Sequence, residues 1–205
     1  MGTNQDYKNR ALQNLTGNWG SAAIVTLVFF LLYSGISNLI STFLGTTEGL
    51  VFNIVWVLCL MPLSWGYVIE FLDFTRGQQL SCGKLFDGFK NGQWGRIFTT
   101  SLLVVIYTTL WTLLFIIPGI IKSFSYAMTS FVLKDHPEMS NNAAIEESMR
   151  LMQGNKMRLF WLLLSFIGWG ILAVLTLGIG FLLLYPYIET TLAHFYEDLK
   201  AERGE

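Results

Sequence analysis

The chain has 205 residues and a net charge of −1; 53% of its residues are hydrophobic and only 13% are charged. Ordinary soluble domains carry about 25% charged residues, so this composition excludes that class and favours a membrane protein. The near-neutral charge, without a basic stripe interleaved with aromatic residues, argues against nucleic acid as a partner. The length predicts one domain, residues 1–205.

In chain order, the apolar residues form four blocks separated by polar segments. The first two blocks are 19–44 and 50–74, and the short turn from Gly45 to Gly49 separates them. The third and fourth blocks are 97–133 and 159–188. A membrane-spanning helix needs about 20 apolar residues, so each of the last two blocks is long enough for two crossings.

Turn residues divide these two long blocks. Pro118 and Gly119 are predicted to end a helix because proline lacks the amide donor and clashes with the preceding turn. Gly178 and Gly180 predict a similar break in the fourth block. The sequence therefore predicts an all-α membrane bundle of six transmembrane helices arranged as three helical hairpins.

Basic residues indicate the orientation of these hairpins. All but one of the 13 Lys and Arg residues lie outside the predicted outer turns and hydrophobic blocks, and the exception is Lys122. An excess of Lys and Arg marks cytoplasmic segments. We therefore expect both termini in the cytoplasm and the turn at Pro118 and Gly119 on the outer side.

A similar segment precedes each hairpin. Each has two apolar residues three positions apart and then a glycine: Leu12, Leu15 and Gly17; Phe86, Phe89 and Gly92; Met149, Met152 and Gly154. We interpret each as a short amphipathic helix at the cytoplasmic interface, followed by a glycine stop. The pattern predicts three repeats, 11–74, 86–135 and 149–198, related by a pseudo-threefold axis along the membrane normal.

The third of these segments is the clearest amphipathic helix. Ser140, or one of the two asparagines after it, is expected to cap its start, and Arg150 near its end suits the helix dipole. Ile145, Met149 and Met152 form its apolar stripe. That stripe is expected to pack on the membrane interface or on the ends of the bundle; a groove on a partner protein is the alternative.

Polar residues inside the hydrophobic blocks are the candidate binding residues. Glu189 lies about ten residues beyond the last turn, roughly 15 Å deep at the helical rise, where an ionisable group needs a partner or water. The predicted substrate-binding set is Glu189, Lys122, Tyr126, Ser125, Thr129 and Tyr185. The alternative is a purely structural contact of Glu189 with Lys122 or with the tyrosines. Glu70 and Asp73 are expected at a solvated cytoplasmic rim.

Enzymatic signatures are absent from the sequence. His136 and His194 are its two histidines, and they lack metal-ligand spacing. The chain has no phosphate-binding loop, no GxSxG motif and no paired catalytic carboxylates. We therefore expect neither catalysis nor a cofactor nor a metal.

Several runs of sequence resemble a known family. They are GYVIEFLDFTRG (66–77), LFDGF (85–89), PGIIKSFSYAMTSFVLKD (118–135), AIEESMRLMQGNK (144–156), LSFIGWGILAVLTLGIG (164–180) and FYEDL (195–199). Together they resemble a bacterial membrane family, the domain-of-unknown-function family numbered 975. The resemblance implies a multi-pass protein of the bacterial cytoplasmic membrane, and it brings no activity, cofactor or catalytic residue.

Three functions are compatible with this pattern. We expect non-enzymatic binding or transport of a small amphipathic molecule, such as a peptide or a lipid-like compound, within a protein surrounded by membrane lipids. The alternative is a scaffold or assembly factor whose cytoplasmic amphipathic helices dock a partner membrane protein. A weaker third hypothesis is an enzyme that acts on lipid.

Overall fold

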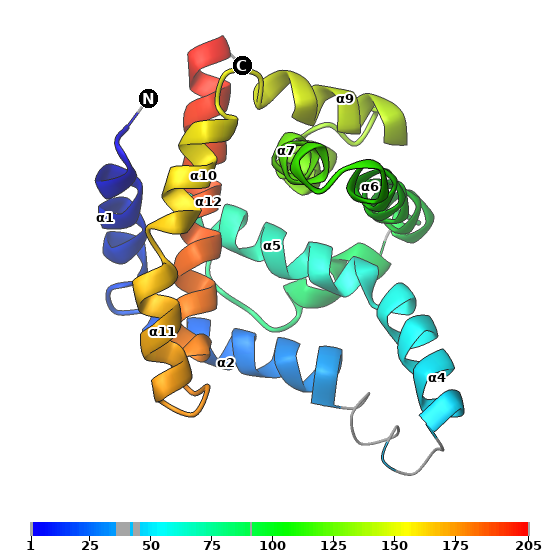
Figure 1. The fold of residues 1–205 in the computed structure, drawn as a ribbon. Coiled ribbons are helices and arrows are strands. Elements are labelled where there is room, and N and C mark those ends of the chain that lie inside the picture. Colours follow the sequence, from blue (N-terminus) through cyan, green and yellow to red (C-terminus); the bar gives the residue numbers. More distant parts are fainter. Residues whose placement is uncertain (1, 36–41, 43–45, 91, 205) are drawn as a thin grey trace.

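The computed structural model describes residues 2–35, 42, 46–90 and 92–204. Within these ranges every regular element is a helix, as Figure 1 shows, so the all-α class is confirmed. The predicted first turn begins at Gly45, which lies outside the described residues, and Thr46 to Gly49 already belong to a helix.

Helices occupy the predicted hydrophobic blocks, but the predicted second, fourth and fifth crossings are each divided into two helices. The first part of the chain forms α1 (Asn4–Leu15), α2 (Trp19–Phe30), the π-helical turn η1 (Leu31–Gly35), α4 (Thr46–Cys59), α5 (Met61–Thr75) and the 3₁₀ helix η2 (Lys84–Phe89). The second part forms α6 (Trp94–Leu114), α7 (Ile116–Tyr126), α8 (Thr129–Asp135), α9 (Asn141–Leu151), α10 (Lys156–Leu164), α11 (Ile167–Leu175) and α12 (Phe181–Arg203).

Several of these helices have the length and hydropathy of membrane spans. Among the described residues they are Trp94–Leu114, Ile116–Asp135 and Lys156–Leu175, and the number rises to five if two bent helix pairs are each counted as one span. The bent pairs are α1 with α2 and η1, at 96°, and α4 with α5, at 42°. The protein is thus built from membrane-type helices, while the predicted count of six spans is not confirmed.

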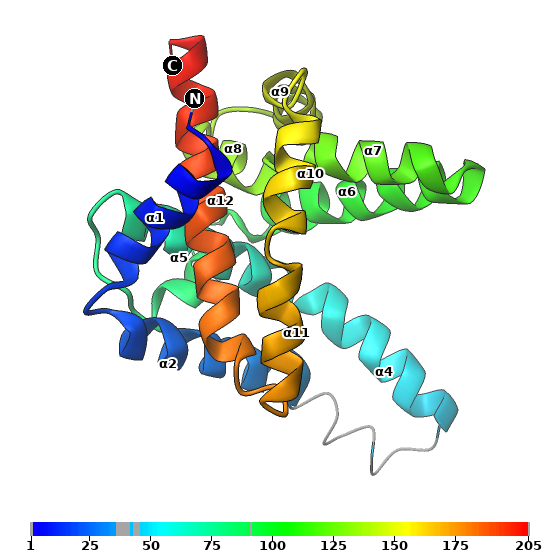
Figure 2. The ribbon, with the colours of Figure 1, turned by 60° about the vertical axis from the view of Figure 1, so that its left-hand side comes forward.

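The helical pairs point in different directions. In Figure 2, α6 and α7 lie side by side across the view, whereas α10, α11 and α12 run along its height. Figure 1 agrees, because there α6 and α7 are seen nearly end-on. These two groups of helices therefore do not both run parallel to one membrane normal.

The turn of the middle hairpin differs from the prediction. Phe115, with extended backbone, separates α6 from α7, so Pro118 and Gly119 lie in the first turn of α7 and do not form the break. Proline is tolerated in a first helical turn, where its missing amide has no partner to lose. The break predicted at Gly178 and Gly180 is confirmed, since α11 ends at Leu175 and α12 begins at Phe181.

Glycine permits close helix contact beside both turns. A Cβ atom on Gly119 would lie 2.7 Å from the Cα atom of Thr112, and one on Gly180 would lie 2.7 Å from the Cα atom of Ala173. Real Cβ atoms do not approach backbone so closely. The absence of a side chain therefore lets α7 pack on α6, and α12 on α11, directly at the turn.

The predicted glycine stops are confirmed. Gly17, Gly92 and Gly154 have positive φ angles of 84°, 68° and 83°, a conformation that glycine adopts without steric cost. The segments before them are α1, η2 and α9, so the second is a 3₁₀ helix and not an α-helix. Ser140 caps α9 through its side chain, as expected. The superposition of the three units stays a prediction.

Helix α5 lies at the centre of the fold. Phe71 and Leu72 are fully buried, and α5 contacts α2, η2, α6, α8 and α12. Gly66 is essential to this packing, because a Cβ atom there would overlap the backbone of Leu85 in η2. The 3₁₀ helix therefore lies directly on α5.

An ion-pair node joins the ends of the hairpins. Asp135, the last residue of α8, accepts two hydrogen bonds of 2.7 Å from Arg76 after α5 and one of 2.6 Å from Lys200 of α12. Tyr196 donates to the same carboxylate at 3.1 Å, and Arg76 also binds Glu197 at 2.8 Å. One carboxylate thus connects three segments that are far apart in the sequence.

Replacing Gly119 with alanine should destabilise the α6–α7 hairpin. The new methyl group has to displace the Thr112 backbone, and such overpacking costs typically 1–3 kcal/mol, about that range here. Gly170→Ala on α11 is the control because nothing lies within 4 Å of its Cβ position. Thermal unfolding in detergent should show a lower midpoint for the first variant alone; equal midpoints would contradict the close contact.

Candidate functional site

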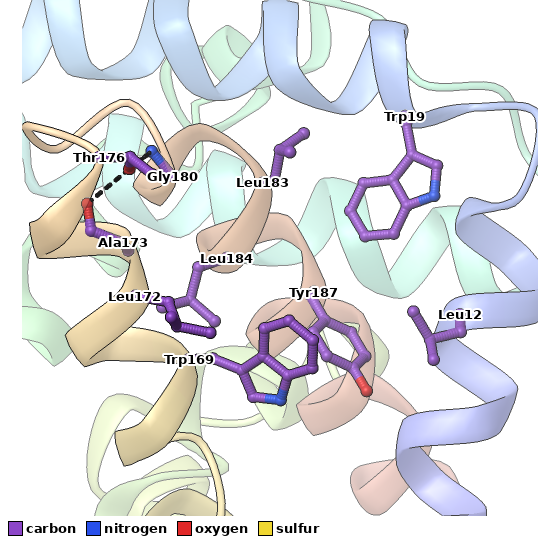
Figure 3. A pocket seen from close by; sticks show the side chains of 10 residues that line it. All are labelled: Leu12, Trp19, Trp169, Leu172, Ala173, Thr176, Gly180, Leu183, Leu184 and Tyr187. Carbon is purple, nitrogen blue, oxygen red and sulfur yellow. Dashed lines mark hydrogen bonds between the residues drawn. The ribbon is translucent and has the colours of Figure 1, made fainter.

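An apolar groove lies between the first helices of the chain and its last two. Its volume is about 330 Å³, and its walls come from α1, the start of α2, α11 and α12 (Figure 3). The lining residues are Leu12, Trp19, Trp169, Leu172, Ala173, Thr176, Gly180, Leu183, Leu184 and Tyr187. Gly17 makes this groove possible, since its positive φ lies at the 96° bend that separates Leu12 from Trp19.

Helix α1 is fixed in place as one wall of the groove. Thr3 and Asp6 form a capping box at its start. Arg10 makes two hydrogen bonds of 2.9 and 3.0 Å to Asp198 of α12, and Tyr7 packs edge-on against Phe195 at 5.5 Å. These contacts hold α1 along the end of α12.

The Asp198 carboxylate is charged in this contact. Partial burial by itself would raise its pKa, but hydrogen bonds from Arg10 and from the Gly2 amide lower that pKa below its ordinary value. The pair is half-exposed, so its contribution to stability is in the range of about 0–1 kcal/mol typical of surface ion pairs.

The opposite wall is the α11–α12 turn. The Thr176 hydroxyl donates to the Ala173 carbonyl and accepts from the Gly180 amide, both at 2.8 Å. Figure 3 draws both bonds at one end of the groove. The polar atoms of this turn are therefore satisfied internally, and the groove is left with an apolar surface at this end.

The two ends of the groove differ in polarity. Leu172, Leu183 and Leu184 line the end near Gly180. The hydroxyl of Tyr187 and the indole nitrogen of Trp169 lie towards the other end, where Leu12 also lies (Figure 3). Neither polar group makes a hydrogen bond to another described residue. A tyrosine hydroxyl or an indole N–H in such a position is available to a ligand.

A cation lies behind the polar end. Lys8 is 8% exposed, and its ammonium group donates to the carbonyl oxygen of Ser165 at 2.9 Å and lies 4.3 Å from the ring centre of Phe166. Phe166 packs edge-on against Tyr187 at 5.1 Å. Among the described residues, Lys8 contacts no carboxylate, so its charge is balanced by carbonyl and aromatic contacts alone.

The residues predicted to bind substrate on the fourth crossing lie elsewhere. Ser125, Tyr126 and Thr129 are buried, and Thr129 is without a hydrogen-bond partner among the described residues. The Lys122 ammonium lies 5.0 Å from the ring centre of Trp111 and 3.9 Å from the sulfur of Met149. This part of the set faces α6 and α9.

Glu189 and Tyr185 belong to a different region. Tyr185 is 40% exposed and packs edge-on against Phe30 at 5.0 Å. Glu189 is half-buried on α12, a helix that packs against α5. No ion pair between Lys122 and Glu189 is formed among the described residues, so the structure does not bring the two parts of the predicted set together, and neither residue lines the groove.

Glu70 and Asp73 are not at a solvated rim, so that prediction is wrong. They are 1% and 5% exposed. Glu70 accepts a hydrogen bond from the Ser81 amide, and Asp73 pairs with Lys134 at 3.2 Å. The reason is tertiary: the segment after α5 folds back over the end of that helix and covers both carboxylates.

Sequence reasoning missed the aromatic residues of the groove. It concentrated on ionisable residues because they are costly in a membrane, whereas the groove contains Trp19, Trp169 and Tyr187. The enrichment of Trp and Tyr at membrane interfaces was a usable signal. Within the described ranges, no group of three His, Cys, Asp or Glu side chains is arranged to hold a metal ion.

The fold and the groove define an all-helical membrane protein with an open apolar binding cleft. The chain belongs to DUF975, a protein family of unknown function, whose model matches residues 1–125 and 113–203. The resemblance seen in the sequence is thereby confirmed. Neither the curated proteins nor the solved structures include a match to this chain.

The separation of Lys122 from Glu189 gives a quantitative prediction. Residues without shared partners have additive effects, so the double variant Lys122→Met, Glu189→Gln should unfold with a free energy within about 0.5 kcal/mol of the sum of the single variants. Denaturant or thermal unfolding in detergent measures this. A coupling energy above about 1 kcal/mol would contradict the separation and restore the structural pair.

Proposed function

We propose that this protein binds a lipid-like amphiphile in the groove between α1, α11 and α12. The polar head of the ligand would lie near Tyr187 and Trp169, and its apolar tail would follow α11 and α12 towards Gly180. The observation that carries this proposal is the position of two polar groups without a hydrogen bond to another described residue, the Tyr187 hydroxyl and the Trp169 indole nitrogen, towards one end of an otherwise apolar groove.

The size and opening of the groove support a lipid-like ligand. Its volume of about 330 Å³ lies at the lower end of the roughly 300–1,000 Å³ of small-molecule sites. Leu12, Leu172 and Leu183 on its edges are 39%, 54% and 48% exposed. A ligand would therefore enter from the side, out of the surrounding lipid, and binding is the activity that this geometry supports better than transport.

The scaffold alternative has less support. It requires apolar docking surfaces on the cytoplasmic amphipathic helices. Leu12 of α1 and Phe86 of η2 are 39% and 43% exposed. On α9, however, the clearest of these helices, Ile145 and Met152 are 2% and 0% exposed. They pack against the neighbouring helices α6, α7 and α8, which contact α9. In this conformation the apolar stripe of α9 belongs to the interior of the protein.

The proposal includes a location and an orientation. We propose the bacterial cytoplasmic membrane with both termini in the cytoplasm, because Lys and Arg concentrate in the segments between the hairpins. The recurring glycine stops at Gly17, Gly92 and Gly154 support three related units. Each hairpin returns to the side of the membrane on which it starts. The proposed cytoplasmic position of both termini therefore does not depend on how deeply each hairpin enters the membrane.

Blocking the groove should reduce co-purification of the ligand. Leu183→Trp puts a larger side chain on the edge of the groove, and native mass spectrometry of the purified protein should show at least about a tenfold loss of bound amphiphile, equivalent to about 1.4 kcal/mol. Val174→Trp is the matched control: it is on α11, 63% exposed, and outside the groove lining.

The two variants separate the possible results. Loss of the bound species in Leu183→Trp and its retention in Val174→Trp is the expected result. Equal amounts of bound amphiphile in both variants and in the unmodified protein would contradict a ligand in this groove. Extraction and identification of the released compound would then give its head group and chain length.

A further inference from the structure

Helix α9 lies across the flank of the α6–α7 hairpin. Figure 1 shows α9 lying across the nearly end-on α6 and α7, and Figure 2 shows the far end of these two helices extending beyond α9. Two contacts fix the level of the crossing. The Tyr107 hydroxyl of α6 lies 3.5 Å from Oδ1 of Asn142, and the Lys122 ammonium of α7 lies 3.9 Å from the sulfur of Met149.

The outer face of α9 is polar and charged. Asn142, Glu146 and Arg150 occupy positions four residues apart and are all exposed. Glu147 pairs with Arg150 at 2.7 Å. A charged side chain at the centre of a bilayer costs at least about 2.5–3.5 kcal/mol, so this face of α9 requires water or lipid head groups. The level at which α9 crosses the hairpin is therefore the membrane interface.

The hairpin beyond this level is short. From Tyr107 to the turn at Phe115 is about eight residues, or about 12 Å at the helical rise, and from Lys122 it is about 10 Å. The hydrocarbon core of a bilayer is about 30 Å thick. The free end of the hairpin therefore has the length of one leaflet.

The free end is apolar throughout its turn. Leu113, Leu114, Phe115, Ile116 and Ile117 are consecutive, and each is at least 63% exposed. The other described turn between apolar helices, at 176–180, also exposes Leu177 and Ile179, by 95% and 69%, but a threonine and two glycines alternate with them. The turn at Phe115 has no such interruption, and five bulky apolar residues in a row suit a hydrocarbon environment.

Two backbone hydrogen bonds connect the residues of this turn. The Phe115 amide donates to the Trp111 carbonyl at 3.0 Å, and the Gly119 amide donates to the Phe115 carbonyl at 3.1 Å. Pro118 has no amide hydrogen, which removes one of the groups that a helix start leaves without a partner. These features reduce the number of backbone polar groups that have to be desolvated when a turn is placed in lipid.

A lysine at the boundary of the free end contacts a tryptophan within it. Trp111 is 38% exposed, and the Lys122 ammonium lies over its ring. Tryptophan and lysine are typical of the head-group level, where a lysine extends its charge out of the hydrocarbon. This position explains how Lys122 is accommodated although it contacts no carboxylate among the described residues.

We propose that the α6–α7 hairpin is a re-entrant anchor whose free end, residues 108–121, contacts the acyl chains of one leaflet and does not cross the membrane. Both ends of the hairpin are on the cytoplasmic side. A re-entrant hairpin and a hairpin that crosses the membrane twice both begin and end on the cytoplasmic side. Both arrangements therefore agree with the observed distribution of Lys and Arg. The different directions of the α6–α7 and α10–α12 groups agree with this arrangement.

Site-directed spin labelling measures the depth of the hairpin. The two free cysteines, Cys59 and Cys82, are replaced by serine, and single cysteines are introduced at Thr99, Ile106 and Ile117. The labelled proteins are reconstituted into phosphatidylcholine–phosphatidylglycerol vesicles. Power saturation with oxygen and a water-soluble nickel complex gives the depth of each label, on a scale calibrated with doxyl lipids.

The re-entrant anchor and a crossing hairpin give opposite orders of depth. The anchor predicts the deepest label at Ile117, a shallower one at Ile106 near the interface, and a solvent-exposed one at Thr99. A crossing hairpin places the deepest label at Ile106 and exposes Ile117 to water on the far side, which would overturn the proposal. Exposure of Ile117 to water on the cytoplasmic side would overturn it as well.

Discussion

The carboxylate of Asp135 is the contact on which the arrangement of the hairpins depends. It is 9% exposed as a side chain and is held between Arg76 and Lys200, with Tyr196 as an additional donor. The side chains of Arg76 and Lys200 are 31% and 20% exposed. Removing one partner therefore costs between about 1 kcal/mol, as for an exposed ion pair, and about 3–5 kcal/mol, as for a fully buried one. The node is thus a constraint that joins the segment after α5 to the ends of α8 and α12.

Apolar packing around the node directs the helices outward from it. Phe131 stacks on Tyr196 with ring centres 5.0 Å apart, and the Trp65 indole donates to the Ser130 carbonyl at 3.0 Å, so α5, α8 and α12 are joined by both polar and apolar contacts. The groove is a consequence of this arrangement. With α12 fixed at the node, α1 packs along the C-terminal end of α12. The bend between α1 and α2 leaves a space beside α12, and α11 forms the opposite wall of that space.

The sequence was sufficient where the relevant signal is local. Hydropathy predicted the helices, and glycine predicted the stop at Gly154 and the break before α12, because both depend on a few neighbouring residues. The turn at Phe115 was misplaced because proline is compatible with a first helical turn as well as with a break. The burial of Glu70 and the assembly of the groove from Leu12, Trp169 and other distant residues depend on tertiary contacts, which no local pattern encodes.

A double-mutant cycle on Arg76 and Asp135 tests the central claim most directly. The variants Arg76→Gln and Asp135→Asn, alone and combined, are compared by their free energies of unfolding in detergent. If the node holds the hairpins together, each single variant is destabilised and the coupling energy is about 0.5–3 kcal/mol, the range measured for residues in direct contact. Additive effects with no coupling would contradict the account, because the ion pair would then contribute nothing specific to the packing of the three hairpins.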